Sequence, residues 1–141
     1  MKEGDTLSEQ LGFQIQMLHS VASEAARTAV AHLDITPARG TALLLIRANP
    51  GCTQTALGEA LNVNRSSAMK IVDMLEGRGW VLRAANSDPR AHALELTPAG
   101  EAYCEALDEA FAAHERKFFG GLSAVERRSL LSILRRLRTG K

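Results

Sequence analysis

The sequence predicts a mainly α-helical chain that carries one small β-hairpin. The 141 residues are 45% apolar but only 4% aromatic, so the core must be aliphatic, and leucine and alanine favour helices. Apolar residues recur at spacings of three and four along most of the chain, which is typical of amphipathic helices. Only residues 80–96 break this pattern, because two short segments of strand composition flank a polar turn there.

The composition is that of one ordinary globular domain, residues 1–141, with 23% charged residues and a net charge of +1. No stretch approaches the roughly 18 consecutive apolar residues that span a bilayer, and the N-terminus lacks the pattern of a signal peptide. We therefore expect a cytoplasmic protein without membrane contact. Cys52 and Cys104 lack metal-ligand spacing, so we expect two small buried hydrophobes and no cofactor.

The first predicted helix runs from Thr6 to about Leu33. It carries one apolar stripe along its length and a second stripe through Phe13, Met17 and Val21. A helix that is apolar on two sides is usually buried on two sides, so a second packing surface is expected. A partner subunit is the simplest such surface; a central position within a monomer is the alternative.

The second predicted helix begins at Thr36-Pro37, a capping residue followed by proline, and ends at the three helix-breaking residues 49–51. A pair of short helices is predicted after it. Residues 53–61 then form a short helix, with Leu57, Ala60 and Leu61 inward. After about three residues a second amphipathic helix follows, which is the helix-turn-helix pattern. Its inward row is Ala68, Ile71, Val72 and Leu75.

The segments that follow this pair of helices predict a winged helix. Residues 80–83 have strand composition, residues 85–91 form a polar turn, and residues 92–96 alternate at period two. Asp88 and Pro89 suit the first two positions of a type I turn. Thr97-Pro98 opens a long helix to about Phe119, and a capping box from Ser123 to Glu126 opens the last helix.

The segments LGEALNVNRSSAMKIVDMLEGRGWVLR and SDPRAHALELTPAGE carry a resemblance to the MarR family of bacterial transcription regulators. They match the family's helix-turn-helix, its wing with an Asp-x-Arg motif and its entry into the next helix. The resemblance implies a DNA-binding lobe at residues 36–100 and dimerisation helices at 1–34 and 101–141. It also implies a homodimeric repressor of a pseudo-palindromic operator in double-stranded DNA. A small aromatic carboxylate or thioester, or thiol oxidation, would relieve repression.

The outward arc of the second short helix is the predicted reading surface. Asn64 caps that helix and leaves its free N–H groups beside a phosphate. Arg65 and Lys70 can donate to guanine or phosphate, Ser66 and Ser67 to bases or backbone, and Met69 can pack on a thymine methyl group. Asp73 would repel phosphates, so we expect it to pair with Lys70 one turn earlier.

The wing supplies the remaining predicted contacts. Arg83 suits a phosphate contact at the wing base, and Arg90 at the tip suits a narrow, electronegative minor groove, with Asp88 orienting its guanidinium. Arg78, at the end of the preceding helix, either contacts DNA or merely favours the helix dipole.

Arg90→Ala is expected to weaken operator binding at least tenfold while thermal stability stays unchanged. The expected loss follows from removing a cation from an electronegative groove. Binding titrations check it, and an unchanged affinity would contradict the wing assignment.

The resemblance also implies an effector site between the first two helices, the long helix and the wing. Phe13, Met17, Arg39 and Leu43 are the matching positions, with Arg39 suited to a carboxylate. Phe13 and Met17 can equally be core residues. Cys52 precedes a helix start, where a thiolate is stabilised, so oxidation sensing stays an alternative.

Two other classes of function compete with DNA binding. An enzyme is disfavoured, because the four histidines are scattered and the glycines form no phosphate loop. A winged helix can also serve as a protein-interaction module without specific DNA binding. The basic set Arg65, Lys70, Arg83 and Arg90 on one face favours DNA.

Overall fold

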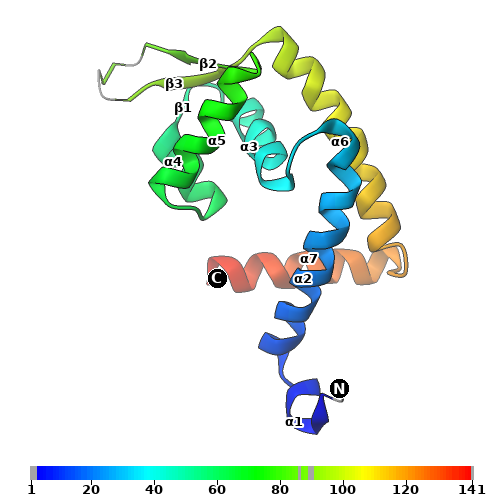
Figure 1. Cartoon of the computed structure of the whole chain (residues 1–141). Helices are drawn as coiled ribbons and strands as arrows, with labels where there is room; N and C mark the ends of the chain where they lie inside the picture. Colours follow the sequence, from blue (N-terminus) through cyan, green and yellow to red (C-terminus); the bar gives the residue numbers. More distant parts are fainter. Residues whose placement is uncertain (1–2, 86, 89–90, 141) are drawn as a thin grey trace.

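The computed structural model describes residues 3–85, 87–88 and 91–140. It confirms a mainly helical fold with a small antiparallel sheet. Figure 1 shows two parts, a compact lobe of helices with the sheet and a set of long helices that extend away from it. The lobe holds α3 (Pro37–Ala48), α4 (Gln54–Leu61), α5 (Arg65–Gly77) and strands β1 (Cys52–Thr53), β2 (Val81–Ala84) and β3 (Ala93–Leu96).

The extended part is built on α2 (Leu11–Val30) and α6 (Pro98–Phe118), which pack against each other. A short 3₁₀ helix, η1 (Ala31–Leu33), joins α2 to the lobe. The N-terminal α1 (Gly4–Ser8) lies at the far end of this part (Figure 1). The C-terminal α7 (Ala124–Thr139) starts with the predicted capping box, Ser123 to Glu126.

The structure corrects the predicted continuous helix from Thr6 to Leu33. The helix is interrupted at Gln10, whose backbone is extended, and its last turn is 3₁₀ rather than α. Neither glycine nor proline stands at residues 9 and 10, so nothing in the local sequence signals the break. Ala60, predicted to face inward, is exposed, whereas Leu57 is buried as predicted.

The sheet has three strands in the order β1-β3-β2, where the sequence predicted only the hairpin. Cys52 pairs with Leu94 and Thr53 with Ala93. A strand of two residues is too short to show a period-two pattern in the sequence. β1 is therefore recognised only by its pairing with β3. The extra strand ties the α3–α4 connection to the base of the wing.

One aliphatic core joins the lobe to the long helices. Leu43 and Ile46 of α3, Leu75 of α5, Leu94 of β3 and Leu107 of α6 are all fully buried. Because these side chains come from both parts, the lobe and α6 share their packing.

A close backbone approach fixes the start of α6 against the lobe. The Thr97 N–H donates to the Trp80 carbonyl over 3.0 Å, and the Thr97 hydroxyl donates to the Gly79 carbonyl over 2.6 Å. A Cβ added to Gly100 would lie only 2.1 Å from the Trp80 carbonyl oxygen. Glycine is therefore required at this position on steric grounds.

Candidate nucleic-acid interface

The N-terminus of α5 is capped by a side chain and is exposed on the surface. Asn64 has extended backbone dihedrals, and its side-chain oxygen accepts the Ser67 N–H over 2.8 Å. This bond satisfies one of the unpaired N–H groups of the first turn and leaves others free for an anion. The helix N-terminus with its positive dipole end is therefore suited to a phosphate.

The two faces of α5 divide as the sequence predicts. Ala68, Ile71, Val72 and Leu75 are buried and hold the helix on the lobe. The opposite side is exposed and comprises Arg65, Ser66, Met69, Lys70 and Asp73, with Ser67 half-buried beside them. Met69 keeps 46% of its surface exposed, so a large apolar side chain is presented among polar ones.

A glycine lets α4 and α5 approach closely. A Cβ added to Gly58 would lie 3.1 Å from the Cβ of Ala68. Both helices therefore meet through small residues, as the helix-turn-helix interpretation requires.

Arg83 joins the wing base to α5. Its Nη2 donates to Asp73 Oδ1 over 2.6 Å, its Nη1 donates to Glu76, and Gln54 lies at 3.4 Å. The predicted pairing of Asp73 with Lys70 is therefore wrong: the forked guanidinium reaches two carboxylates that are neighbours on one helix face. Within the described residues Lys70 forms no ion pair, so its ammonium group is available to a partner.

Much of the tip of the wing lies outside the described residues, which include neither Pro89 nor Arg90. The Ala91 N–H donates to the Asp88 carbonyl over 3.1 Å. The contacts predicted for Arg90, and the orienting role of Asp88, stay predictions. The phosphate contact of Arg83 likewise stays a prediction, and its guanidinium binds two carboxylates within the protein.

A second set of contacts fastens the lobe and α6 to η1 and the residue that follows it, and the sequence did not reveal it. Arg78 binds Asp34 over 2.8 Å and lies over the Trp80 ring, 5.4 Å from its centre. Trp80 stacks on Tyr103 of α6 with ring centroids 3.8 Å apart, and the Tyr103 hydroxyl donates to the Leu33 carbonyl. Arg78 therefore forms an ion pair within the protein, in addition to any favourable interaction with the helix dipole.

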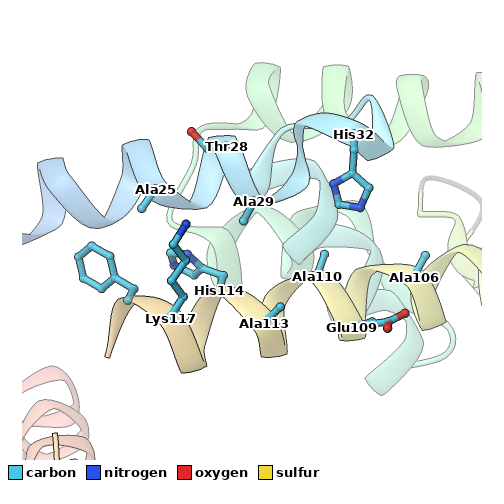
Figure 2. Close-up of a pocket in the computed structure, with 11 residues that line it drawn as sticks. Ala25, Thr28, Ala29, His32, Ala106, Glu109, Ala110, Ala113, His114 and Lys117 are labelled. Atoms are coloured by element: carbon cyan, nitrogen blue, oxygen red, sulfur yellow. The ribbon is translucent and has the colours of Figure 1, made fainter. Parts of the chain in front are cut away.

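The four predicted effector residues differ in burial, and their ligand-binding role stays a prediction. Leu43 is fully buried in the core, Phe13 and Arg39 are half-buried, and Met17 is 43% exposed. A cavity of about 860 Å³ lies elsewhere, between the C-terminal half of α2 and the facing side of α6 (Figure 2). None of the four predicted residues lines it.

Burial disfavours ionisation of both cysteine thiols. Burial raises the pKa of Cys52, and it raises the pKa of Cys104 to about 11. Burial of Cys52 thus opposes any stabilisation of its thiolate by the neighbouring helix start. Oxidation sensing by Cys52 stays an alternative prediction, and burial of its thiol opposes it.

Both cysteines are accordingly expected to stay unreactive toward iodoacetamide near neutral pH in the native protein. Titration of the native and the urea-unfolded protein checks this, because the unfolded thiols should react at the ordinary rate. Rapid labelling of native Cys52 would contradict the assignment.

Within the described ranges no helix is long and apolar enough to cross a membrane, and no group of three metal-ligating side chains is assembled. The described fold, with its capped helix-turn-helix and strand-paired wing, defines a winged helix-turn-helix regulator as the class of protein.

Comparison with known proteins identifies the family. The MarR family profile matches residues 35–92. The putative transcriptional regulatory protein for the hcr operon of Thauera aromatica is 33% identical over 134 residues, which cover 94% of this chain and 81% of the relative. The multiple antibiotic resistance protein MarR of Escherichia coli K12 is 32% identical over 96 residues, 67% of each chain. The chain belongs to the MarR family of transcriptional regulators, which are not enzymes.

Solved structures agree with this assignment over nearly the whole chain. The transcriptional repressor CouR bound to a 23-mer DNA duplex superposes with a TM-score of 0.90 at 35% identity, covering 98% of both chains. CouR bound to p-coumaroyl-CoA gives a TM-score of 0.85 at 33% identity, covering 98% of this chain and 97% of that one. A cysteine-to-serine mutant of E. coli MarR with operator DNA gives 0.81 at 28% identity, covering 90% and 92%.

Proposed function

We propose that this protein is a homodimeric repressor that binds a pseudo-palindromic operator in double-stranded DNA and is released by a small-molecule effector. The observation that carries the proposal is the exposed arc of α5 beside its open, capped N-terminus. An exposed helix of this kind is the element that enters the major groove in helix-turn-helix proteins. Arg65, Ser66, Ser67, Met69 and Lys70 are its proposed contacts, with Arg83 and Arg90 on the wing.

Similarity supports DNA as the partner. The similar repressor CouR and the similar E. coli MarR mutant were each solved with DNA. The free ammonium group of Lys70 adds an observation on this chain, because an exposed cation on a recognition helix attracts phosphate.

Exposed apolar faces support a homodimer. On α2, Leu11 is 77% exposed and Val21 58% exposed, and on α7 Leu137 is 62% exposed. The leucine-rich α7 has no buried residue at all. A 16-residue helix gains little stability unless its apolar side is covered, and a second copy of the chain would cover it.

An effector is supported by the similar repressor CouR, which was solved with p-coumaroyl-CoA. The contacts that join η1 and Tyr103 of α6 to Trp80 and Arg78 of the lobe offer a route from ligand to DNA. Arg78, at the end of α5, binds Asp34, which follows η1, so a ligand-induced shift of η1 would act on the end of α5.

A mobility-shift titration tests the proposal. The probe is the region upstream of the protein's own coding sequence, and a scrambled duplex of equal length is the control. The proposal predicts a specific, salt-sensitive complex, since phosphate contacts release counterions. Equal binding to both duplexes would favour the alternative, a winged-helix protein-interaction module.

Lys70→Ala is expected to lower the slope of log K against log salt by about one, because one phosphate contact is lost. Fluorescence anisotropy at several salt concentrations measures the slope. An unchanged slope with altered base preference would instead make Lys70 a base reader. Arg116→Ala, an exposed cation on α6, is the control and should leave both quantities unchanged.

A further inference from the structure

The exposed arc of α5 carries two negative charges as well as two positive ones. Arg65 and Lys70 lie in the first half of the helix, and Asp73 and Glu76 lie in the second half, so α5 has no net formal charge. All four residues are exposed, and at 3.6 residues per turn both carboxylates lie on the same side of the helix as Met69. Duplex DNA is a dense polyanion, so two free carboxylates on this arc would oppose its approach.

Arg83 of β2 supplies a cation to this part of α5. Strand β2 lies against α5 (Figure 1). The Arg83 Nη2 donates to Asp73 Oδ1 over 2.6 Å, and the Arg83 Nη1 donates to Glu76. Carboxylates three residues apart on a helix repel each other, whereas a planar guanidinium has separate N–H groups for each of them. Arg83 therefore screens both carboxylates from a single position.

The guanidinium of Arg83 is held in place by the sheet and by α4. In the register of the hairpin Arg83 pairs with Leu94 of β3, which is fully buried. The Arg83 side chain is only 21% exposed, and the Gln54 side-chain oxygen of α4 lies 3.4 Å from Nη2. Salt screens a partly buried ion pair less than a fully exposed one. The ion pairs therefore connect the base of the wing to the recognition helix in a defined position.

We propose that Arg83 is a positioning residue for DNA recognition, which acts through Asp73 and Glu76. By binding both carboxylates it removes their repulsion of the phosphates, and it fixes the base of the wing relative to α5. This role is separate from the phosphate contact proposed for the same side chain. It rests on the proposed function, because it concerns the binding of DNA.

A double-mutant cycle on DNA affinity tests the inference, with the region upstream of the protein's own coding sequence as the duplex. Arg83→Gln removes the charge but keeps a polar side chain, and it is made in the wild type and in an Asp73→Asn/Glu76→Gln background. In the wild type it is expected to weaken binding about twentyfold, a coupling within the range for contacting residues. Without the two carboxylates the loss is expected to be less than about threefold.

Equal losses in the two backgrounds overturn the inference, because a cation that acts only on phosphate does not need Asp73 or Glu76. Arg116→Gln is the matched control, since it removes the same charge from an exposed position on α6. It should leave the affinity unchanged in both backgrounds. Urea unfolding of each variant shows that it is folded under the conditions of the titration.

Salt dependence separates charge screening from a distorted lobe. The Debye length falls from about 10 Å at 0.1 M ionic strength to about 3 Å at 1 M, so salt weakens the repulsion that Arg83→Gln exposes. The ratio of wild-type to Arg83→Gln affinity is therefore expected to fall between about 0.05 and 0.3 M salt. A ratio that does not change with salt indicates a change of shape and overturns the inference.

A charge-conserving variant gives a second measurement that does not depend on the folding of Arg83→Gln. Arg83→Lys keeps the cation between the carboxylates and is expected to bind the duplex within about fivefold of the wild type, since one of the two ion pairs can remain. Binding by Arg83→Lys as weak as that of Arg83→Gln contradicts screening by charge.

Failure of the inference is distinguishable from failure of the proposed function. A wild-type protein that forms no specific DNA complex refutes the proposed function, and the inference falls with it. A wild-type protein that binds the duplex specifically, with an Arg83→Gln loss that is independent of Asp73 and Glu76, refutes only the inference.

Discussion

Gly100→Ala is expected to lower the free energy of unfolding by about 3 kcal/mol, the upper part of the range for overpacked sites. The added Cβ would lie 2.1 Å from the carbonyl oxygen of Trp80 and 3.0 Å from its carbonyl carbon. Both are backbone atoms, so no rotamer change relieves the contact. The start of α6 must move, which strains the Thr97 hydrogen bonds to Gly79 and Trp80.

Urea unfolding at one fixed protein concentration measures this effect. Gly121→Ala is the matched control, since an added Cβ there meets nothing within 4 Å and its φ is not positive. The control should change stability by less than about 1 kcal/mol. Equal stability of the two variants would show that the approach of Trp80 to α6 is not as close as described.

Leu134→Glu is expected to dissociate the proposed dimer and to abolish operator binding. Leu134 lies on the apolar side of α7 and is 44% exposed in the single chain. Burying a leucine contributes about 2 kcal/mol, and a two-fold interface loses that contribution twice. The loss of about 4 kcal/mol raises the dimer dissociation constant roughly a thousandfold, before any cost of burying the charge.

Sedimentation equilibrium measures the association, and a mobility shift follows DNA binding in the same samples. Ser132→Glu is the control, because at 3.6 residues per turn Ser132 lies on the opposite side of α7 and receives the same charge. A Leu134→Glu protein that remains dimeric at the wild-type concentration would exclude α7 from the interface.

The helices of this fold could be predicted from the sequence because their signals are local. Thr36, Thr53, Thr97 and Ser123 each cap the helix that follows them, and each cap is present in the structure. The inward row of α5 was predictable for the same reason, since periodicity alone specifies which face is apolar.

The features that could not be predicted from the sequence depend on contacts between elements that are distant along the chain. Strand β1 requires β3 as a partner, and the ion pair of Arg83 with Asp73 requires the wing to fold back on α5. The cavity depends on the separation of α2 and α6, which no local pattern specifies. A signal did exist in the run EAFAAHERKF, where alanines line a helix beside His114 and Lys117.

Methylation protection of guanine N7 in the operator complex tests the central claim most directly, because N7 lies in the major groove where α5 is proposed to enter. Two protected half-sites related by a dyad, about 10 base pairs or a multiple of this apart, are the predicted result. A specific complex that leaves every N7 accessible, or that protects a single site, would contradict reading by two copies of α5.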